Sequence, residues 1–484
     1  NVFSISANEP GTFMYEPNWM SILPPVLAII LSIVTRQVII SLSVGILAGY
    51  CVLESVNPIA GAALAIDGVI NVFSDSGDTK VLIFTLIIGG MIATIEKVGG
   101  VKGFIHLLEH RGWVNSPKKA KWLAYFTGVV IFIESNITLL IAGAISRPLF
   151  DRYKIAREKL AYIIDSTSAP ICIMIPLNAW GAVILSLVGS STTSNPLEIF
   201  VLAIPFNFYP IAVILFSAFV IWANVNIGPM KKAQLRTEDG NLLWPEATPM
   251  VDPSVVAQHK VANEDDKAHF MIAPIAVMVL AMPFGLYITG DGVITNGSGS
   301  TAVLWAVLSG VLTLWLFVLA HKRLSVHELM QTFLKGAGGF LPVAMILLLA
   351  LALGDVANLL GTGIYVAQLA QDTIPTFLLL PLLFFTSSFI AFSIGSSWGT
   401  FGIMIPLALQ IAIALELSEP LFLAAVLSGS VFGDHASPIS DTTVVASMAS
   451  ATDHIDHVRT QLPYAILTAI IAMVCFFAAG LFLL

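Results

Sequence analysis

Two short polar stretches lie within apolar segments of this chain, and they decide how the fold is interpreted. The first reads DSTSAP at residues 165–170, and the second reads DHASP at residues 434–438. Each begins with an aspartate and ends in a proline, which removes a helical hydrogen bond and frees a backbone carbonyl. An ionisable group at membrane depth costs about 2.5–3.5 kcal/mol on insertion scales, so it needs a partner or a function. Whether the two aspartates lie at that depth depends on the segments around them.

The composition is typical of an integral membrane protein. Of 484 residues, 57% are hydrophobic and 11% are charged, whereas a soluble domain has about 45–50% apolar and about 25% charged residues. Long apolar runs recur along the whole chain, for example at 22–35, 38–53, 81–95, 199–222 and 465–484. The sequence therefore predicts an all-α membrane protein whose main partner is the lipid bilayer.

Charge and cysteine usage exclude other classes. The formal net charge is −8, and no basic stripe indicates a nucleic-acid partner. Cys51, Cys172 and Cys475 each lie in an apolar run, so neither a disulfide nor a thiolate metal site is expected. The first apolar run has no basic flank before it, which argues against a cleavable signal peptide. Because the chain starts with Asn1, we expect the native start to be missing or processed.

Lysine and arginine collect in cytoplasmic loops, and they orient the spans. Residues 97–121 and 147–159 are both rich in these bases, so both are predicted inside, although the apolar stretch at about 122–146 joins them. Its middle is polar, and we therefore predict a re-entrant hairpin that enters from the cytoplasm. A second hairpin, at about 377–415, is interrupted by SIGSSWGT at 393–400 and has no base on either side. It is predicted to enter from outside.

The two halves of the chain follow the same order of segments with opposite orientation. We predict inverted repeats at residues 1–226 and 269–484, joined by a cytoplasmic linker at 227–268. Each repeat has two spans, a short amphipathic linker, a span, a re-entrant hairpin, an interrupted span and a last span, which makes five transmembrane helices and one hairpin. Inverted repeats whose broken helices meet near the bilayer midplane are a transporter architecture.

Asp165 and Asp434 occupy equivalent positions in the predicted repeats, each beside a break rich in serine and threonine. Carboxylate, hydroxyl and carbonyl oxygens form the hard-ligand shell that small cations such as Na⁺ prefer. No cofactor is expected besides Na⁺ as the transported or coupling ion. The residues predicted to bind the cation or proton are Asp165, Ser166 and Thr167 at the first break, Asp434, Ser437, Asp441 and Thr442 at the second, Glu134, Ser135, Asn136 and Thr138 at the first hairpin tip, and Ser396, Ser397 and Thr400 at the second.

Structural interpretations compete with these functional ones. A single serine or threonine in a membrane helix usually bonds to its own backbone, and a buried aspartate can be a structural partner. Because aspartate clusters with serine and threonine at two positions related by the predicted repeat, an ion-binding role is favoured over a structural one. The run DHIDH at 453–457 has residues that bind metals or sense pH, but a solvated cytoplasmic loop is the favoured interpretation.

The strings GDHASPISDTT at 433–443 and DHIDHVRTQLPY at 453–464 resemble the NhaC-type sodium–proton antiporter family. The strings RP at 147–148 and REKLAYIIDSTSAP at 157–170 extend the resemblance, which covers about residues 80–470. It implies a multi-pass transporter of the bacterial inner membrane, within the wider ion-transporter superfamily. Members of that superfamily look like homodimeric elevator machines with two re-entrant hairpins, and some relatives look like exchangers of malate and lactate.

One departure from the family pattern concerns the first hairpin tip. Where the family commonly has paired acidic residues, this chain has Glu134 and Ser135, followed by Asn136 in place of an aromatic residue. One carboxylate is therefore absent at this tip, which bears on ion stoichiometry and on the identity of the substrate.

These features favour secondary active transport in which a midplane carboxylate, Asp165 or Asp434, binds either Na⁺ or H⁺. The second candidate is a Na⁺- or H⁺-coupled carrier of a small carboxylate or amino acid, with Asn178, Trp180 or Trp398 shaping a larger pocket. An intramembrane aspartyl hydrolase is disfavoured because both carboxylates lie in cation-type oxygen clusters, so no enzyme is predicted. A channel is disfavoured because two opposite hairpins suit alternating access.

Overall fold

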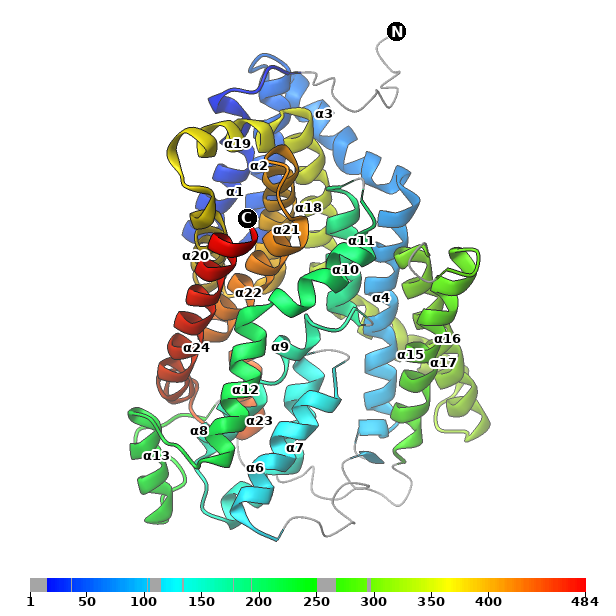
Figure 1. The fold of residues 1–484 in the computed structure, drawn as a ribbon. Coiled ribbons are helices and arrows are strands. Elements are labelled where there is room, and N and C mark those ends of the chain that lie inside the picture. Colours follow the sequence, from blue (N-terminus) through cyan, green and yellow to red (C-terminus); the bar gives the residue numbers. More distant parts are fainter. Residues whose placement is uncertain are drawn as a thin grey trace.

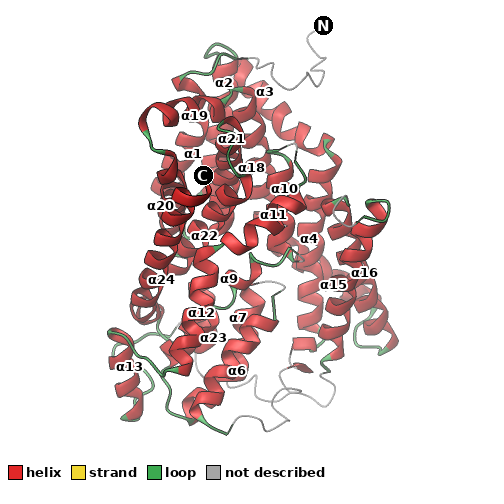
Figure 2. Ribbon diagram, in the orientation of Figure 1, coloured by secondary structure: helices red, strands yellow, loops and turns green. Residues whose placement is uncertain are grey.

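The computed structural model describes residues 15–35, 37–101, 103–104, 115–132, 135–176, 178–192, 194–249, 267–293 and 297–484. Regular structure within these ranges is entirely helical (Figure 2). The α-helices are α1 (Leu23–Thr35), α2 (Val38–Leu53), α3 (Pro58–Asn71), α4 (Ser76–Lys97), α6 (Pro117–Val130), α7 (Ser135–Arg152), α8 (Arg157–Asp165), α9 (Ala169–Cys172), α10 (Ala179–Gly189), α11 (Pro196–Ala203), α12 (Phe208–Trp222), α13 (Pro229–Glu238), α15 (His269–Thr289), α16 (Gly299–Ala320), α17 (Val326–Gly339), α18 (Leu341–Leu359), α19 (Thr362–Thr373), α20 (Leu379–Ile394), α21 (Ser397–Ala414), α22 (Glu419–Ala436), α23 (Asp441–Ser450) and α24 (His454–Leu483). Short 3₁₀ turns are η1 (Trp19–Ile22), η2 (Val72–Ser74), η3 (Ile204–Phe206) and η6 (Thr376–Leu378).

Within the described ranges, seven helices are long and apolar enough to cross a membrane. These are α4, α15, α16, α18, α20 (with η6), α21 and α24. An eighth span results if α11 with η3 and α12 count as one, although the two parts are bent by 44° at Asn207. The predicted all-α membrane protein is thus confirmed, and the apolar run at 199–222 is divided between α11, η3 and α12.

The helices form two neighbouring groups (Figure 1). In one group, α15 packs on α16, and both α16 and α17 pack on α4. In the other, α20, α22, α24 and α12 pack against one another, and α23 packs on α7 and α8. The breaks that follow Asp165 and Asp434 belong to the second group. Residues 227–249, the longer described part of the predicted linker, carry α13.

The polar stretches at 165–170 and 434–438 both break their helices. Helix α8 ends at Asp165, and the chain passes through a turn and the four-residue α9 before α10 begins at Ala179. Helix α22 ends at Ala436, and Ser437 adopts an extended conformation (φ −81°, ψ 133°). This is the conformation favoured before a proline, because the ring of Pro438 clashes with a helical residue in front of it. Ser440 then caps the next helix, α23, by accepting from the Thr442 N–H.

Each predicted hairpin consists of two helices with a break between them. Helices α6 and α7 pack together, and they reach further than predicted, from Pro117 to Arg152. Helix α20 ends at Gly395, which has a left-handed conformation (φ 73°), and Ser396 caps α21. The side from which each pair enters the membrane, the inverted repeat and the domain bounds stay predictions.

Replacing Gly395 with alanine is expected to destabilise the protein by about 2 kcal/mol or more. The left-handed conformation costs a non-glycine residue about 1–2 kcal/mol, and an added Cβ at Gly395 would lie 2.6 Å from the Ile439 carbonyl oxygen. Thermal unfolding in detergent measures the effect. Gly338→Ala is the matched control, because a Cβ there meets nothing within 4 Å. Equal melting temperatures for the two variants would contradict the strain at the α20–α21 turn.

Candidate ion-binding site

Asp434 lies at the end of α22 and accepts hydrogen bonds from the second hairpin. One carboxylate oxygen accepts from the Ser397 hydroxyl at 2.7 Å and from the Ser397 N–H at 3.3 Å. The other accepts from the Ser440 hydroxyl. Because Ser397 is the first residue of α21, the carboxylate faces the positive end of that helix, which stabilises an anion. Asp434 is 1% exposed, and the site is therefore a buried carboxylate held by two hydroxyls and one N–H.

Further oxygen atoms surround this carboxylate. The Ser397 hydroxyl lies 3.3 Å from the Ser430 carbonyl oxygen, and the Ser440 hydroxyl lies 3.0 Å from the Thr442 hydroxyl. A hydroxyl can turn its lone pairs toward a cation while its proton points to another acceptor. The side chains around Asp434 thus offer hard oxygen ligands, the type that suits a small cation.

Asp165 lies in a different chemical environment, rich in nitrogen. Its Oδ2 accepts from the Gln461 side-chain amide at 2.8 Å, and it lies 3.5 Å from His457 Nε2 and 3.9 Å from His435 Nε2. The Ser166 hydroxyl contacts the same His435 nitrogen at 3.4 Å. All five side chains are buried. An uncompensated charge is costly at such depth, so this carboxylate needs a proton or a cationic partner.

The two aspartates are joined through neighbouring residues of α22. His435 follows Asp434 directly, and its ring faces Asp165 while its Nδ1 contacts the Tyr209 hydroxyl at 2.6 Å. Its backbone carbonyl accepts from Gln461 at 2.7 Å. The structure thus places the two sites back to back, with Asp434 facing the second hairpin and Asp165 facing α24.

The break in the first hairpin is held by the segment that follows Asp165. The Phe132 carbonyl accepts from the Asn178 amide at 2.8 Å, and the same amide bonds the Cys172 carbonyl at 2.8 Å. The Thr138 hydroxyl donates to the Ile131 carbonyl. Asn136 Oδ1 is buried and has no hydrogen-bond partner among the described residues. Glu134 lies outside the described residues, and Ser135 is buried at the start of α7.

Other predicted residues hold the backbone of the breaks. The Thr167 hydroxyl donates to the Ile163 carbonyl at 2.8 Å. The Thr400 hydroxyl donates to the Ser396 carbonyl at 3.0 Å. The Ser437 hydroxyl donates to the Phe392 carbonyl at 2.7 Å, and this bond connects the second break to α20. For Thr167 and Thr400, a bond to the carbonyl four residues earlier is a common structural role of such residues in membrane helices. Asp441 begins α23, and its side chain lies outside what the structure describes.

Residues 184–481, more than half of the chain, match the Na⁺/H⁺ antiporter family.

The chain belongs to the Na⁺/H⁺ antiporter family.

It is 33% identical to an uncharacterised protein of Haemophilus influenzae over 489 aligned positions, which cover 95% of this chain and 90% of that protein. It is 32% identical to the malate-2H⁺/Na⁺-lactate antiporter of Bacillus subtilis over 167 positions, 32% of this chain and 33% of that protein. Among solved structures, the YdaH transporter of Alcanivorax borkumensis has a TM-score of 0.53 at 14% identity, covering 87% of this chain and 88% of that one. This likeness shows a shared fold. As a member of the antiporter family, the protein is a multi-pass membrane transporter rather than an enzyme.

The prediction that residues 453–457 form a solvated loop is wrong. Helix α24 begins at His454, and Asp453 caps it by accepting from the Ile455 and Asp456 N–H groups. His457 is 0% exposed and lies beside Asp165. Among the described residues, no group of three or more histidine, cysteine or acidic side chains has the arrangement of a metal site.

The sequence analysis did not identify Ser440 as a hydrogen-bond partner of Asp434, Gln461 as a partner of Asp165, or Tyr209 as a partner of His435. A signal for Gln461 was available, because His457 and Gln461 are four residues apart and therefore share one face of a helix. Nothing in the sequence around Tyr209 distinguishes it from an aromatic residue at a membrane interface.

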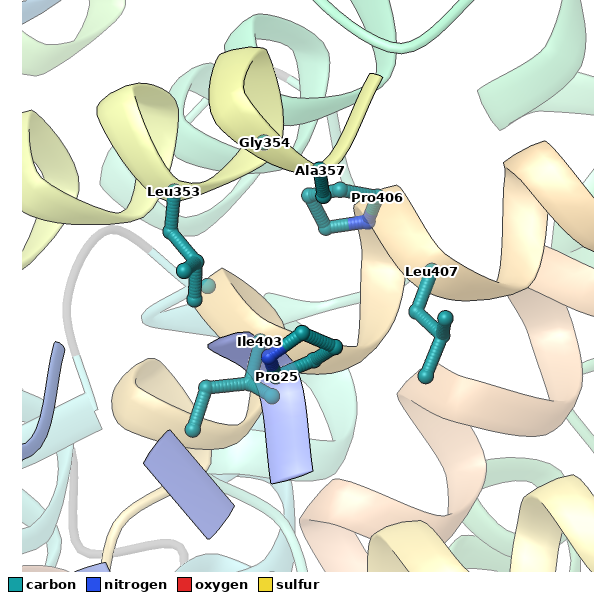
Figure 3. A pocket seen from close by; sticks show the side chains of 8 residues that line it. Pro25, Leu353, Gly354, Ala357, Ile403, Pro406 and Leu407 are labelled. Atoms are coloured by element: carbon teal, nitrogen blue, oxygen red, sulfur yellow. The ribbon is translucent and has the colours of Figure 1, made fainter. Parts of the chain in front are cut away.

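An apolar pocket between α1, α18 and α21 is a poor ion site (Figure 3). Its eight lining residues are all apolar: Pro25, Leu353, Gly354, Ala357, Gly402, Ile403, Pro406 and Leu407. An ion there would lose its hydration without gaining ligands, which is strongly unfavourable. The polar groups around the two aspartates are therefore better suited to an ion.

Ser397→Ala is expected to raise the KM of the antiporter for its cation about tenfold while leaving the protein folded. The Ser397 hydroxyl bonds Asp434 directly, and a hydrogen bond to a charged group contributes about 1.5 kcal/mol, or about tenfold. Concentration-dependent uptake in proteoliposomes measures KM. Ser393→Ala is the matched control, since the hydroxyl of this half-buried residue donates to the Phe389 carbonyl of its own helix. An unchanged KM in Ser397→Ala would remove this hydroxyl from the site.

Proposed function

We propose that this protein exchanges Na⁺ for H⁺ across the bacterial inner membrane, as a secondary active transporter that works by alternating access. The observation that carries the proposal is the Asp434 site. It is a buried carboxylate at a helix break, it accepts from Ser397 and Ser440, and further hydroxyl and carbonyl oxygens lie beside it. These ligands suit Na⁺, which is the transported ion in this scheme.

Asp165 is the proton acceptor in this proposal. Its neighbours are the amide nitrogen of Gln461 and the rings of His435 and His457, which offer few oxygen ligands to Na⁺. A proton neutralises a buried carboxylate without needing a coordination shell. Cation binding at one aspartate and proton binding at the other account for why the chain has two buried carboxylates back to back.

The inverted repeat, the two re-entrant hairpins and an elevator motion of a homodimer are parts of the same proposal. Two features support it. Both predicted hairpins are helix–break–helix units, and the second one contributes Ser397 to the Asp434 site. Helices α15, α16 and α17 lie together with α4 at one side of the molecule (Figure 1), as expected if one part of each subunit is stationary.

A Na⁺- or H⁺-coupled carrier of a small carboxylate or amino acid is the second candidate function. The rings of Trp180 and Trp398 lie 4.6 Å apart, and Phe401 packs against Trp180. Because Trp398 follows Ser397 directly, this aromatic group adjoins the Asp434 site and offers an apolar wall to an organic solute. The similarity to a malate-2H⁺/Na⁺-lactate antiporter supports the same alternative.

Fluorescence measurement of ΔpH in everted membrane vesicles tests the proposal. Addition of Na⁺ to energised vesicles that contain the protein is expected to dissipate the pH gradient, whereas vesicles without it show no change. Malate, lactate, arginine and other small solutes are then added one at a time, with and without Na⁺. A pH response that requires an organic solute would replace Na⁺/H⁺ exchange by the second candidate function.

A further inference from the structure

The amide nitrogen of Gln461 bonds both aspartate sites. It donates to Asp165 Oδ2 at 2.8 Å and to the His435 backbone carbonyl at 2.7 Å. His435 follows Asp434 in the last turn of α22, where that helix gives way to the break. One side chain of α24 therefore links the carboxylate after α8 to the backbone of the Asp434 site.

The chemistry of the amide fixes this arrangement. An amide NH₂ has two hydrogens, and both acceptors here are oxygens that cannot donate when Asp165 is ionised. The nitrogen must therefore face them, and both of its hydrogens are used. Gln461 Oε1 is buried and has no hydrogen-bond partner among the described residues. Within that part of the chain, the amide is held only through its nitrogen, so it follows whichever acceptor moves.

The His435 ring also connects the two sites, because its Nε2 lies 3.9 Å from Asp165 Oδ2 and 3.4 Å from the Ser166 hydroxyl, but these contacts do not involve the His435 carbonyl. The Tyr209 hydroxyl contacts the His435 ring and not its carbonyl, and His457 lies beside Asp165 without a hydrogen-bond partner for either ring nitrogen among the described residues. A displacement of the α22 end when a cation enters the Asp434 site must lengthen or bend the bond from Gln461 to the His435 carbonyl. Because the same nitrogen bonds Asp165, the strain passes directly to that carboxylate.

We infer that Gln461 is a positioning residue that couples the Asp434 and Asp165 sites, so that occupancy of one changes the affinity of the other. This inference rests on the proposed exchange of Na⁺ for H⁺. It assigns Gln461 no contact with either transported ion. Removing its amide is expected to separate the two events: the cation still binds and moves, but its movement no longer drives a proton.

Two transport modes of purified protein in proteoliposomes test this role. Na⁺/Na⁺ exchange, followed with radioactive Na⁺ at equal pH on both sides, requires only the cation site. Na⁺-driven H⁺ movement, followed with a trapped pH dye, requires both sites. In Gln461→Met, which keeps the side-chain length without the amide, we expect Na⁺/Na⁺ exchange within about twofold of wild type and an unchanged KM for Na⁺. Na⁺-driven H⁺ movement is expected to fall at least about tenfold, the effect of losing one hydrogen bond to a charged group.

Gln410→Met is the matched control. Gln410 is also largely buried in a membrane helix, but its Oε1 accepts from the Gly363 N–H at 3.2 Å, apart from both aspartates. This variant is expected to keep both modes, and Gln461→Ala repeats the test with a smaller side chain. Gln461 variants that keep both modes, lose both in parallel, or fail to accumulate in the membrane overturn the coupling role. Failure of the proposed function is distinct, because wild-type protein would then show no Na⁺-driven H⁺ movement.

Discussion

Replacing Asp434 with asparagine is expected to abolish transport in both modes, Na⁺/Na⁺ exchange as well as Na⁺-driven H⁺ movement. The substitution keeps the size of the side chain but removes the negative charge that offsets the dehydration of a cation. The loss of a buried charge partner costs at least about 3 kcal/mol, which corresponds to a decrease of at least about 100-fold. The asparagine amide would also direct its hydrogens at Ser397 or Ser440, which now donate to the carboxylate.

Both modes are measured in proteoliposomes at matched protein density, with the melting temperature in detergent as a check of folding. Asp291→Asn is the matched control, because Asp291 is exposed between α15 and α16 and has a positive φ (51°), a conformation that asparagine accepts. Wild-type Na⁺/Na⁺ exchange in Asp434→Asn would show that the cation binds elsewhere, and would overturn the proposed cation site.

The local features of this site could be predicted from the sequence because they depend on residues close together in the chain. Pro438 disfavours a helical conformation at Ser437, where α22 ends, and Gly395 adopts a left-handed conformation that other residues adopt with strain. Ser397 and Asp434 were both predicted to bind the cation or proton, but their pairing with each other was not predicted. The structure places those two residues in hydrogen-bond contact.

The environment of Asp165 could not be predicted in the same way, because its partners come from distant helices. The separation between Asp165 and Gln461 is 296 residues, and their contact depends on how α8 and α24 pack. The predicted equivalence of the two repeats led us to expect an oxygen-rich shell at both aspartates. In the structure, hydroxyls bond the Asp434 carboxylate, whereas an amide and two imidazoles lie beside the Asp165 carboxylate.

The start of α24 illustrates a further limit of sequence reasoning. A run of charged and imidazole side chains before an apolar segment is typical of a solvated loop, and residues 453–457 were interpreted in that way. Asp453, however, has the side chain and position of a helix cap, so α24 begins before its apolar part does. That one extra turn brings His457 into the interior, where it lies 3.5 Å from Asp165.

Asp165→Asn is expected to abolish Na⁺-driven H⁺ movement and to keep Na⁺/Na⁺ exchange, whereas loss of the cation site abolishes both modes. The asparagine carbonyl can still accept from Gln461, so the bond that holds α24 is preserved, but the group that takes up the proton is gone. We expect Na⁺-driven H⁺ movement to fall at least about 100-fold, by the same reasoning for a buried charge. Na⁺/Na⁺ exchange should persist at a comparable rate, because Asp434, Ser397 and Ser440 are unchanged.

The same proteoliposome assays measure this variant, with Asp239→Asn as a control at an exposed carboxylate at the end of α13. The comparison between the two aspartates decides between two mechanisms. If Na⁺ and H⁺ competed for one carboxylate, replacing that residue would end both modes and replacing the other would spare both. The alternative is loss of both modes in Asp434→Asn and loss of proton movement alone in Asp165→Asn. This result requires two energetically coupled sites, because neither carboxylate by itself would then bind both ions.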